Sequence, residues 1–373
     1  MPPSGGGGIH QSRGPEYRSS AGRCRSARQS GGYLMRLLQH SAYRGPRDRL
    51  RAALDNHRPG HMVFVIGPSG VGKTTMRRSV MREMFGNPNL WEKGKVPAIE
   101  TFACLPVGAY FSSRYLAREL LQELNAPTLT WALEGGSPRS GPPSDIQAEV
   151  RGRDLRLGRY QLRLTEAECW SSVRQSMIAR DCKYVAIDQI SALLVNHKDK
   201  SPADHALHLM ALAESAGSML IMTGVHRAVQ LWSIESELRR SVTSIWVPPY
   251  SVRRREDRAP FLRLLTSLSE RHNFSKQDLL IRMAEDLLVA TAGVYGEVAQ
   301  LLSRAADAAK QEGSERILKR HIEASYYSDN DLANLWRDID DFEDAMEAGS
   351  ATARAKQLKS GWASSYGEVC HEV

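Results

Sequence analysis

The residue pattern with the strongest chemical meaning is the glycine-rich loop GPSGVGKT at residues 67–74, which matches G-x-x-x-x-G-K-[ST] in full. Its glycines allow the backbone to curl so that N–H groups point inward at phosphate oxygens. Lys73 is expected to reach the β- and γ-phosphates, and the Thr74 hydroxyl is expected to bind magnesium. The loop therefore predicts a site for ATP and Mg²⁺. The residues expected to contact the nucleotide are Gly67, Pro68, Ser69, Gly70, Val71, Gly72, Lys73, Thr74 and Thr75.

A carboxylate that can complete this site is Asp188, which follows the apolar run YVAI at residues 184–187. Such a run is typical of a buried strand, and parallel α/β sheets bind ligands at the carboxyl ends of their strands. At that place Asp188 can join Thr74 in holding magnesium with its water shell. The alternative is an aspartate that only caps the end of the strand, because Asp is common in such turns.

Gln189 occupies the position at which many ATPases of this layout carry a glutamate that polarises the attacking water. An amide can orient a water molecule but cannot accept its proton. The sequence therefore predicts an ATPase that binds ATP and hydrolyses it slowly to ADP and phosphate. Asp204 and Glu214, on the helix expected to follow, are the carboxylates that could substitute for the glutamate.

These side chains need strands that end at one edge of a sheet, and the hydrophobic pattern predicts such a scaffold. Strand-length apolar runs alternate with helical periodicity as far as residue 249, which indicates an α/β fold with a parallel sheet. The expected strands are 62–66, 97–105, 183–187, 218–224 and 242–247. The expected helices before and between them are 47–60, 74–85, 113–124, 166–180 and 203–215. Beyond Pro249 only helices are expected, near 258–272, 276–290, 294–312 and 315–326.

Composition divides the chain into four parts. Residues 1–32, rich in Gly, Ser and Arg, predict a disordered basic arm. Residues 33–249 are the expected P-loop α/β domain, in which residues 125–164 lose periodicity and predict an insertion or long loop. Residues 250–326 are the expected helical lid, and residues 327–373 are the expected tail.

The tail contains an acidic run in which apolar residues recur at helical spacing. That pattern predicts an amphipathic helix. The helix could lie in a groove of a partner protein, or it could pack back on the chain's own lid. Its apolar residues are Leu332, Leu335, Trp336, Ile339 and Phe342.

The 373-residue chain has a formal net charge of +8. A basic excess favours a polyanionic partner such as nucleic acid, although solubility alone can also explain it. Basic clusters could contact the phosphates of a DNA duplex or simply form solvated faces. The candidate DNA-binding residues are Arg151, Arg153, Arg156, Arg159, Lys198 and Lys200. The chain has no run of eighteen apolar residues, so no membrane span is predicted.

Several segments together resemble the AAA+ ATPases and, more narrowly, the TnsC/TniB regulators of DNA transposition. They are GPSGVGKTT, YVAIDQISALL, LIMTGVHRAVQLW, ESELRRSVTSIWV and TAGVYGEVAQLLSRAADAAKQEG. The resemblance extends over about residues 45–326. It implies an AAA+ P-loop domain with a five-stranded parallel sheet and a C-terminal helical lid.

The resemblance also implies roles for residues outside the loop. Thr223 corresponds to a polar residue that touches the γ-phosphate or the attacking water. Arg239 or Arg240 resembles an arginine finger, which stabilises charge on the transferring phosphate of a neighbouring subunit. The alternative for this pair is a solvated basic corner. The expected catalytic residues are therefore Lys73, Asp188, Gln189, Thr223, Arg239 and Arg240.

The protein implied by the resemblance is a homo-oligomer that forms a ring or a helical filament on double-stranded DNA. It would recruit a transposase together with a target-selection protein or complex, in the bacterial cytoplasm. The segment GVYGEV departs from many AAA+ proteins because it lacks their lid arginine and has Glu297 in that neighbourhood. Three alternatives stay open: a replication initiator or helicase loader, a signalling NTPase that does not bind DNA, and a structural P-loop protein without turnover.

Overall fold

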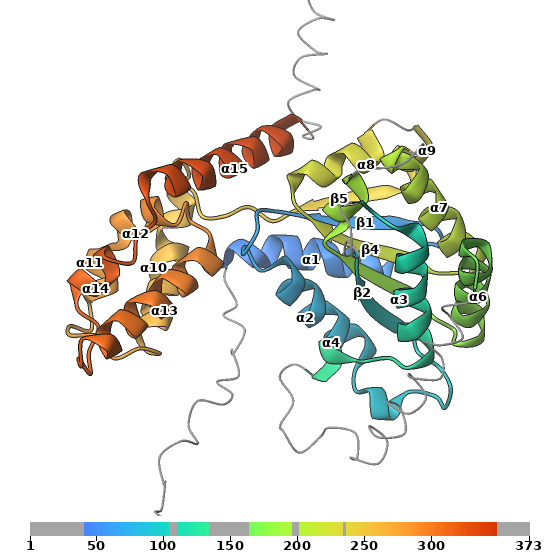
Figure 1. Cartoon of the computed structure of the whole chain (residues 1–373), viewed down its shortest axis with the longest axis horizontal. Coiled ribbons are helices and arrows are strands. Elements are labelled where there is room, and N and C mark those ends of the chain that lie inside the picture. The colour runs from blue at the N-terminus through green and yellow to red at the C-terminus, as the bar shows by residue number, and fades with distance from the viewer. Residues whose placement is uncertain (1–40, 104–109, 134–163, 196–200, 234–235, 349–373) are drawn as a thin grey trace, which may run out of the picture. The chain divides into compact units, whose positions relative to one another are not determined.

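A computed structural model describes residues 41–103, 110–133, 164–195, 201–233 and 236–348 of the chain. Within these ranges the strands form a parallel sheet in the order β2-β3-β4-β1-β5 (Figure 1). The strands are β1 Met62–Ile66, β2 Ala98–Phe102, β3 Tyr184–Asp188, β4 Met219–Gly224 and β5 Val242–Trp246. The predicted five-stranded parallel sheet is confirmed.

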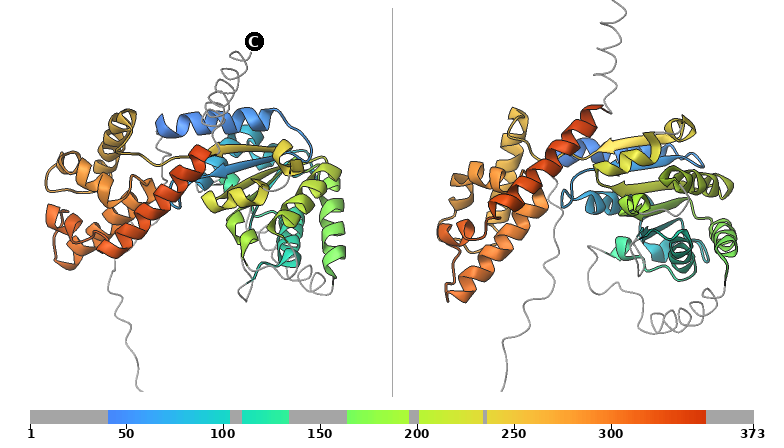
Figure 2. Two further views of the ribbon diagram at one scale, coloured as in Figure 1. Left: turned by 90° about the horizontal axis from the view of Figure 1, so that it is seen from above. Right: turned by 45° about the horizontal axis from the view of Figure 1, so that its top comes forward.

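Helices cover both faces of this sheet, and the central strand shows why its sequence is continuously apolar. Met62, Phe64 and Ile66 of β1 belong to the hydrophobic core shared with α3, α6 and α7. Val63 and Val65 point the other way, into the core shared with α1 and α2. Figures 1 and 2 show these two helical layers on opposite sides of the strands. The helices are α1 Ser41–Asp55, α2 Lys73–Phe85, α3 Ser113–Asn125, α4 Thr130–Leu133, α6 Glu166–Ala179 and α7 Pro202–Ser215.

Short helical turns complete the α/β part of the chain. Two of them, η1 Pro88–Leu90 and η3 Ile190–Leu194, follow α2 and β3 respectively. Three others lie between β4 and β5: η4 His226–Val229, α8 Gln230–Ser233 and α9 Ser236–Arg240. The side chains of Leu231, Trp232 and Leu238 anchor this connection in the core.

The helices that follow β5 have a hydrophobic core of their own, and we call α10 to α14 the helical domain. Its helices are α10 Arg255–Ser269, α11 Leu279–Arg282, α12 Ala284–Ala290, α13 Tyr295–Gln311 and α14 Lys319–Glu323. The core includes Leu265, Leu287, Leu301 and Ile322. The single helix expected over 276–290 is wrong: it is divided at Met283, whose backbone (φ −98°, ψ 13°) leaves the helical conformation.

The acidic helix α15, Asp329–Ala348, packs on its own chain. Ile339 clusters with Ala292 and Val294, which precede α13. The ring of Phe342 lies edge-on to Trp246 at the end of β5, with 5.7 Å between ring centroids. Of the two alternatives for the tail, the packed-back one agrees with these contacts, which involve the α/β core as well as the helical domain. Residues 1–40 and 134–163, which include the expected basic arm and most of the expected insertion, lie outside the described ranges.

A membrane-spanning segment is not found among the described helices, because none is both long enough and apolar enough.

Candidate nucleotide-binding site

The glycine-rich loop joins the end of β1 to the start of α2, and its backbone requires glycine at several positions. Gly70 (φ 75°) and Gly72 (φ 95°) adopt left-handed conformations that glycine reaches without strain. A methyl group on Gly67 would lie 2.5 Å from the carbonyl oxygen of Val247. Because α2 begins at Lys73, its unpaired N–H groups and the positive end of its dipole lie at the loop. The loop therefore has the local geometry of an anion cradle.

The side chain of Lys73 folds back onto the loop, where two backbone carbonyl groups accept its hydrogen bonds. Its Nζ donates hydrogen bonds to Gly67 O at 2.8 Å and to Pro68 O at 2.6 Å. Burial lowers the pKa of Lys73 to about 8, and the negative charge of Asp188 only partly offsets that effect. The ammonium group is thus desolvated in a place where a phosphate would be its natural counter-ion.

We expect nucleotide affinity to fall as the pH rises through about 8, because the Lys73 pKa is lowered to that value in the nucleotide-free protein. A bound polyphosphate raises the pKa of Lys73, so binding above pH 8 takes up a proton and each further pH unit weakens it by up to about tenfold. Calorimetric titrations between pH 7 and 9, in buffers of different ionisation enthalpy, measure both the affinity and the proton uptake.

The control for this pH dependence is Lys73→Arg, whose guanidinium stays charged throughout the range. If the variant and the parent lose affinity in parallel between pH 7 and 9, the titration does not belong to Lys73.

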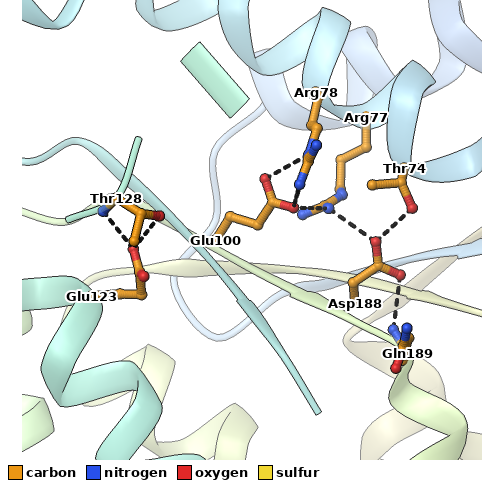
Figure 3. A network of polar contacts seen from close by, with 8 residues as sticks. All are labelled: Thr74, Arg77, Arg78, Glu100, Glu123, Thr128, Asp188 and Gln189. Atoms are coloured by element: carbon orange, nitrogen blue, oxygen red, sulfur yellow. Dashed lines mark hydrogen bonds and ion pairs between the residues drawn. The ribbon is translucent and has the colours of Figure 1, made fainter. Parts of the chain in front are cut away.

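Asp188 and Thr74 meet at the carboxyl end of β3, as the sequence predicts (Figure 3). The Thr74 hydroxyl donates to Asp188 Oδ2 at 2.6 Å, and the backbone N–H of Gln189 donates to Asp188 Oδ1 at 2.8 Å. A hydroxyl beside one carboxylate fits Mg²⁺, which prefers hard oxygen ligands and completes its shell with phosphates and water. Among the described residues no group of three or more His, Cys, Asp or Glu forms a metal cage. Thr74 and Asp188 would hold the ion, whose role is to neutralise phosphate charge.

A buried charge network behind Asp188 was missed by sequence analysis. Arg77 has no exposed surface, and its Nη2 donates to Asp188 Oδ2 at 3.2 Å and to Glu100 Oε1 at 2.9 Å (Figure 3). Arg78 Nε donates to the two Glu100 oxygens at 2.9 and 3.0 Å. Two guanidinium groups therefore balance two carboxylates in the core. The available signal was Glu100 itself, because a charge inside the apolar strand AIETF needs a partner.

Thr223 lies at the same edge of the sheet. It pairs in register with Val65 of β1, and it directly follows Met222, the partner of Ile187 on β3. The residue is fully buried, and its hydroxyl has no hydrogen-bond partner within the described part of the chain. A buried hydroxyl without a partner costs roughly 1–3 kcal/mol. A hydrogen bond from the Thr223 hydroxyl to a bound ligand would offset that cost, so the position suits a ligand-binding residue. Gln189, the residue after β3, is exposed and has a left-handed backbone (φ 56°).

Arg239 and Arg240 do not join this site. Both are exposed at the end of α9, next to Ser241, whose carbonyl accepts the N–H of Met62 at 2.8 Å. Met62 begins β1, whereas the phosphate loop follows its end, about 13 Å further on at ~3.3 Å per residue. The arginines are therefore at the opposite edge of the sheet from the chain's own loop.

Glu214 and Asp204, the two carboxylates that could substitute for the missing glutamate, occupy different places in the structure. Glu214 packs beside Gly60, where a methyl group would lie 2.9 Å from the Glu214 Cβ. Gly60 precedes β1, so Glu214 lies at the amino edge of the sheet and its expected role is wrong. Asp204 accepts the Ser201 N–H at 2.8 Å in a capping box that starts α7.

The DNA-binding candidates Arg151, Arg153, Arg156, Arg159, Lys198 and Lys200 all lie outside the described residues.

Two further residues lie on segments that contact the loop, and the sequence pointed to Glu297 but not to Tyr43. The hydroxyl of Tyr43 on α1 would lie 2.9 Å from a methyl group on Gly72, and burial raises the pKa of this tyrosine. Glu297 follows Gly296, whose N–H donates to Gly70 O at 2.9 Å. The Glu297 carboxylate accepts the Tyr327 hydroxyl at 2.6 Å. Glu297, which stands near the position of the lid arginine of many AAA+ proteins, is thus tied to Tyr327.

Comparison with known proteins identifies the class to which this site belongs. Residues 44–222 match the family model of the AAA ATPase domain. The chain therefore contains an AAA ATPase domain, and its fold is an AAA+ α/β fold. A search of curated proteins finds no match.

Solved structures similar to this chain include the following three. ORC2 of Aeropyrum pernix, in ADPNP–ADP complexes, is 14% identical with a TM-score of 0.46, over 76% of this chain and 66% of that chain. The Walker-type ATPase PABY2304 of Pyrococcus abyssi is 15% identical with a TM-score of 0.45, over 76% and 70%. Cdc6p of Pyrobaculum aerophilum is 17% identical with a TM-score of 0.48, over 79% and 69%. The chain thus spans 66% of the length of the Aeropyrum structure, and likenesses at these scores do not define what it binds.

Proposed function

We propose that the chain is an ATP-dependent assembly switch that oligomerises on double-stranded DNA and recruits or activates a transposase. One protomer holds the nucleotide and magnesium with Lys73, Thr74 and Asp188. Arg239 or Arg240 of a second protomer completes the site, so the nucleotide bridges two subunits. A repeated head-to-tail contact of this kind gives a ring if it closes and a helical filament if it does not.

The observation that carries the proposal is the separation of two halves of one site. The phosphate loop has its lysine, hydroxyl and carboxylate in place, whereas the exposed arginine pair lies at the opposite edge of the same sheet. An arginine so placed acts on a phosphate only in another copy of the chain, which links turnover to assembly. The net charge of +8 and the TnsC/TniB-like segments support DNA and a transposase as the partners.

Electron microscopy of the protein with duplex DNA, with and without a slowly hydrolysed ATP analogue, tests the switch. Rings or filaments are expected only with the analogue, and the double variant Arg239→Ala/Arg240→Ala is expected to remain dispersed. Arg282→Ala is the matched control, because among the described residues the exposed Arg282 pairs only with Asp278, the N-cap of its own helix. Particles of the parent that stay monomeric in both conditions would refute the switch.

Two further assays distinguish this function from the alternatives by testing for DNA and for a transposase as partners. A DNA-binding chain loses affinity in a gel-shift assay steeply as salt rises, whereas a signalling NTPase shows no shift at any salt. Where a gene beside this one encodes an integrase, a strand-transfer assay with that integrase tests transposition itself. Stimulation that depends on ATP supports the regulator, and its absence with intact DNA assembly favours an initiator or helicase loader.

We expect Gln189→Glu to raise the ATP turnover number by about tenfold or more, since a positioned general base contributes typically 10²–10⁴-fold. The position tolerates the change, because Gln189 is exposed and Glu has nearly the same shape. Phosphate release under saturating ATP measures the effect, with Gln230→Glu on α8 as the control for added charge. A variant no faster than the parent would show that another group limits hydrolysis.

A further inference from the structure

The helical domain touches the phosphate loop through two glycines. The backbone N–H of Gly296, in the first turn of α13, donates to the carbonyl oxygen of Gly70 at 2.9 Å. A methyl group on Gly296 would lie 2.7 Å from that oxygen and 2.8 Å from the Gly70 Cα. Both obstacles are backbone atoms of the loop, so they cannot swing aside as a side chain can. Only glycine at position 296 permits this approach.

Helix formation by itself argues against glycine at this position. Gly296 lies inside a 17-residue helix, and it is not among the glycines with positive φ. Alanine normally favours a helical backbone over glycine, because glycine loses more conformational freedom on folding. The close contact with Gly70 is therefore the physical reason for the residue.

The contact also uses a donor that the helix leaves unpaired. Val294 is the N-cap of α13, so the N–H of Gly296 belongs to the first turn and has no partner within the helix. It pairs with Gly70 O instead. Because the peptide bond between Gly70 and Val71 is planar and trans, a fixed carbonyl also fixes the Val71 N–H on its other side. That N–H points to Pro68 O at 3.4 Å, across the loop that must cradle phosphate.

A second glycine contact fixes the segment that leads into α13. Gly293 (φ 67°) accepts the Tyr250 N–H at 3.0 Å, and a methyl group on it would lie 1.8 Å from Tyr250 O. The next residue, Val294, is fully buried and packs against Ile339 of α15. The segment 293–296 is thus held between the chain leaving β5 and the phosphate loop, which leaves it little freedom to move independently of either.

We propose that Gly296 is a positioning residue: its N–H orients the phosphate loop for nucleotide, and a bound nucleotide fixes the helical domain through the same contact. A backbone donor thereby links loop and helical domain where many AAA+ proteins use an arginine side chain. The inference rests on the nucleotide-binding step of the proposed function and does not require DNA or a transposase.

The test is Gly296→Ala, with binding of a fluorescent ATP analogue and thermal unfolding measured in parallel. We expect affinity to fall by about tenfold or more, because the methyl group forces loop and helix apart. The melting temperature without nucleotide is expected to fall only slightly, because the preference of alanine for a helix partly offsets the cost of the displaced contact, and binding is measured well below it. Gly45→Ala is the matched control, because Gly45 is also helical and a methyl group there has no atom within 4 Å. Its affinity should equal that of the parent.

Amide hydrogen exchange on the parent provides a second test that needs no variant. Saturating nucleotide is expected to slow exchange at Gly296 by about tenfold or more, and the Gly313 amide beyond the end of α13 serves as the reference. If the parent binds nucleotide but Gly296→Ala binds it equally well, or if Gly296 exchange does not respond to nucleotide, this inference alone is overturned. A parent that binds no nucleotide overturns the proposed function together with it.

Discussion

Replacing Lys73 with methionine is expected to weaken nucleotide binding by at least about 100-fold, because charge-assisted hydrogen bonds contribute roughly 1.5–3 kcal/mol each and the ammonium serves two phosphates. The substitution keeps the aliphatic stem and removes the two bonds to Gly67 O and Pro68 O that place the head group in the nucleotide-free loop. Because burial penalises the charge of Lys73 and lowers its pKa to about 8, a neutral side chain there avoids that penalty in the nucleotide-free protein. The folded protein is therefore expected to survive the change.

Calorimetry with ATP and Mg²⁺ measures the loss, and assembly on duplex DNA provides the linked readout. Lys183→Met is the matched control, since Lys183 is an exposed lysine and its ion-pair partner, Asp181, is itself exposed. Under the proposed function the Lys73 variant fails to form rings or filaments at any nucleotide concentration that assembles the parent. A variant that assembles on DNA as the parent does would show that nucleotide does not govern self-association.

Replacing Arg77 with methionine is expected to destabilise the chain by about 3–5 kcal/mol, the effect of removing one partner from a buried ion pair. The side chain is fully buried, and its Nη2 contacts both Asp188 and Glu100. Without it, Asp188 loses its ion-pair partner and Glu100 keeps Arg78. Urea unfolding followed by circular dichroism measures the change in the free energy of unfolding.

The double variant Arg77→Met/Glu100→Gln separates charge from packing. It removes one charge of each sign, so it is expected to be more stable than Arg77→Met alone. Arg282→Met is the surface control, because its exposed pair with Asp278 contributes at most about 1 kcal/mol. An Arg77→Met protein that unfolds at the parent's urea midpoint would mean that the network does not stabilise the fold.

Much of the fold follows from local pattern. The run MVFVI is apolar on both faces, which only a central strand of a covered parallel sheet requires, and β1 has those bounds. The phosphate loop can also be predicted from the sequence, because its glycines, lysine and threonine lie within one short stretch of the chain. Asp188 could be placed beside Thr74 because parallel strands end at one edge, and the structure puts their oxygens 2.6 Å apart.

Contacts between distant segments could not be predicted in the same way. A charged residue inside an apolar strand signals a buried partner, but nothing in the sequence says that Glu100 pairs with Arg77 and Arg78 on α2. Glu214 had the right chemistry for a catalytic carboxylate and lies at the wrong edge of the sheet. The apolar face of α15 indicated a helix, but its periodicity could not distinguish a partner's groove from the surface beside Trp246.

The class of chemistry in this protein follows from local sequence, since the residues that cradle phosphate are neighbours along the chain and their spacing sets the geometry of the loop. Tertiary structure alone decided what stabilises and controls that cradle. Arg77 reaches Asp188 through the core, and Gly296 meets Gly70 from a helix more than two hundred residues away along the sequence. Such contacts depend on close packing between elements, and close packing depends on which faces meet, a property that no single stretch of sequence contains.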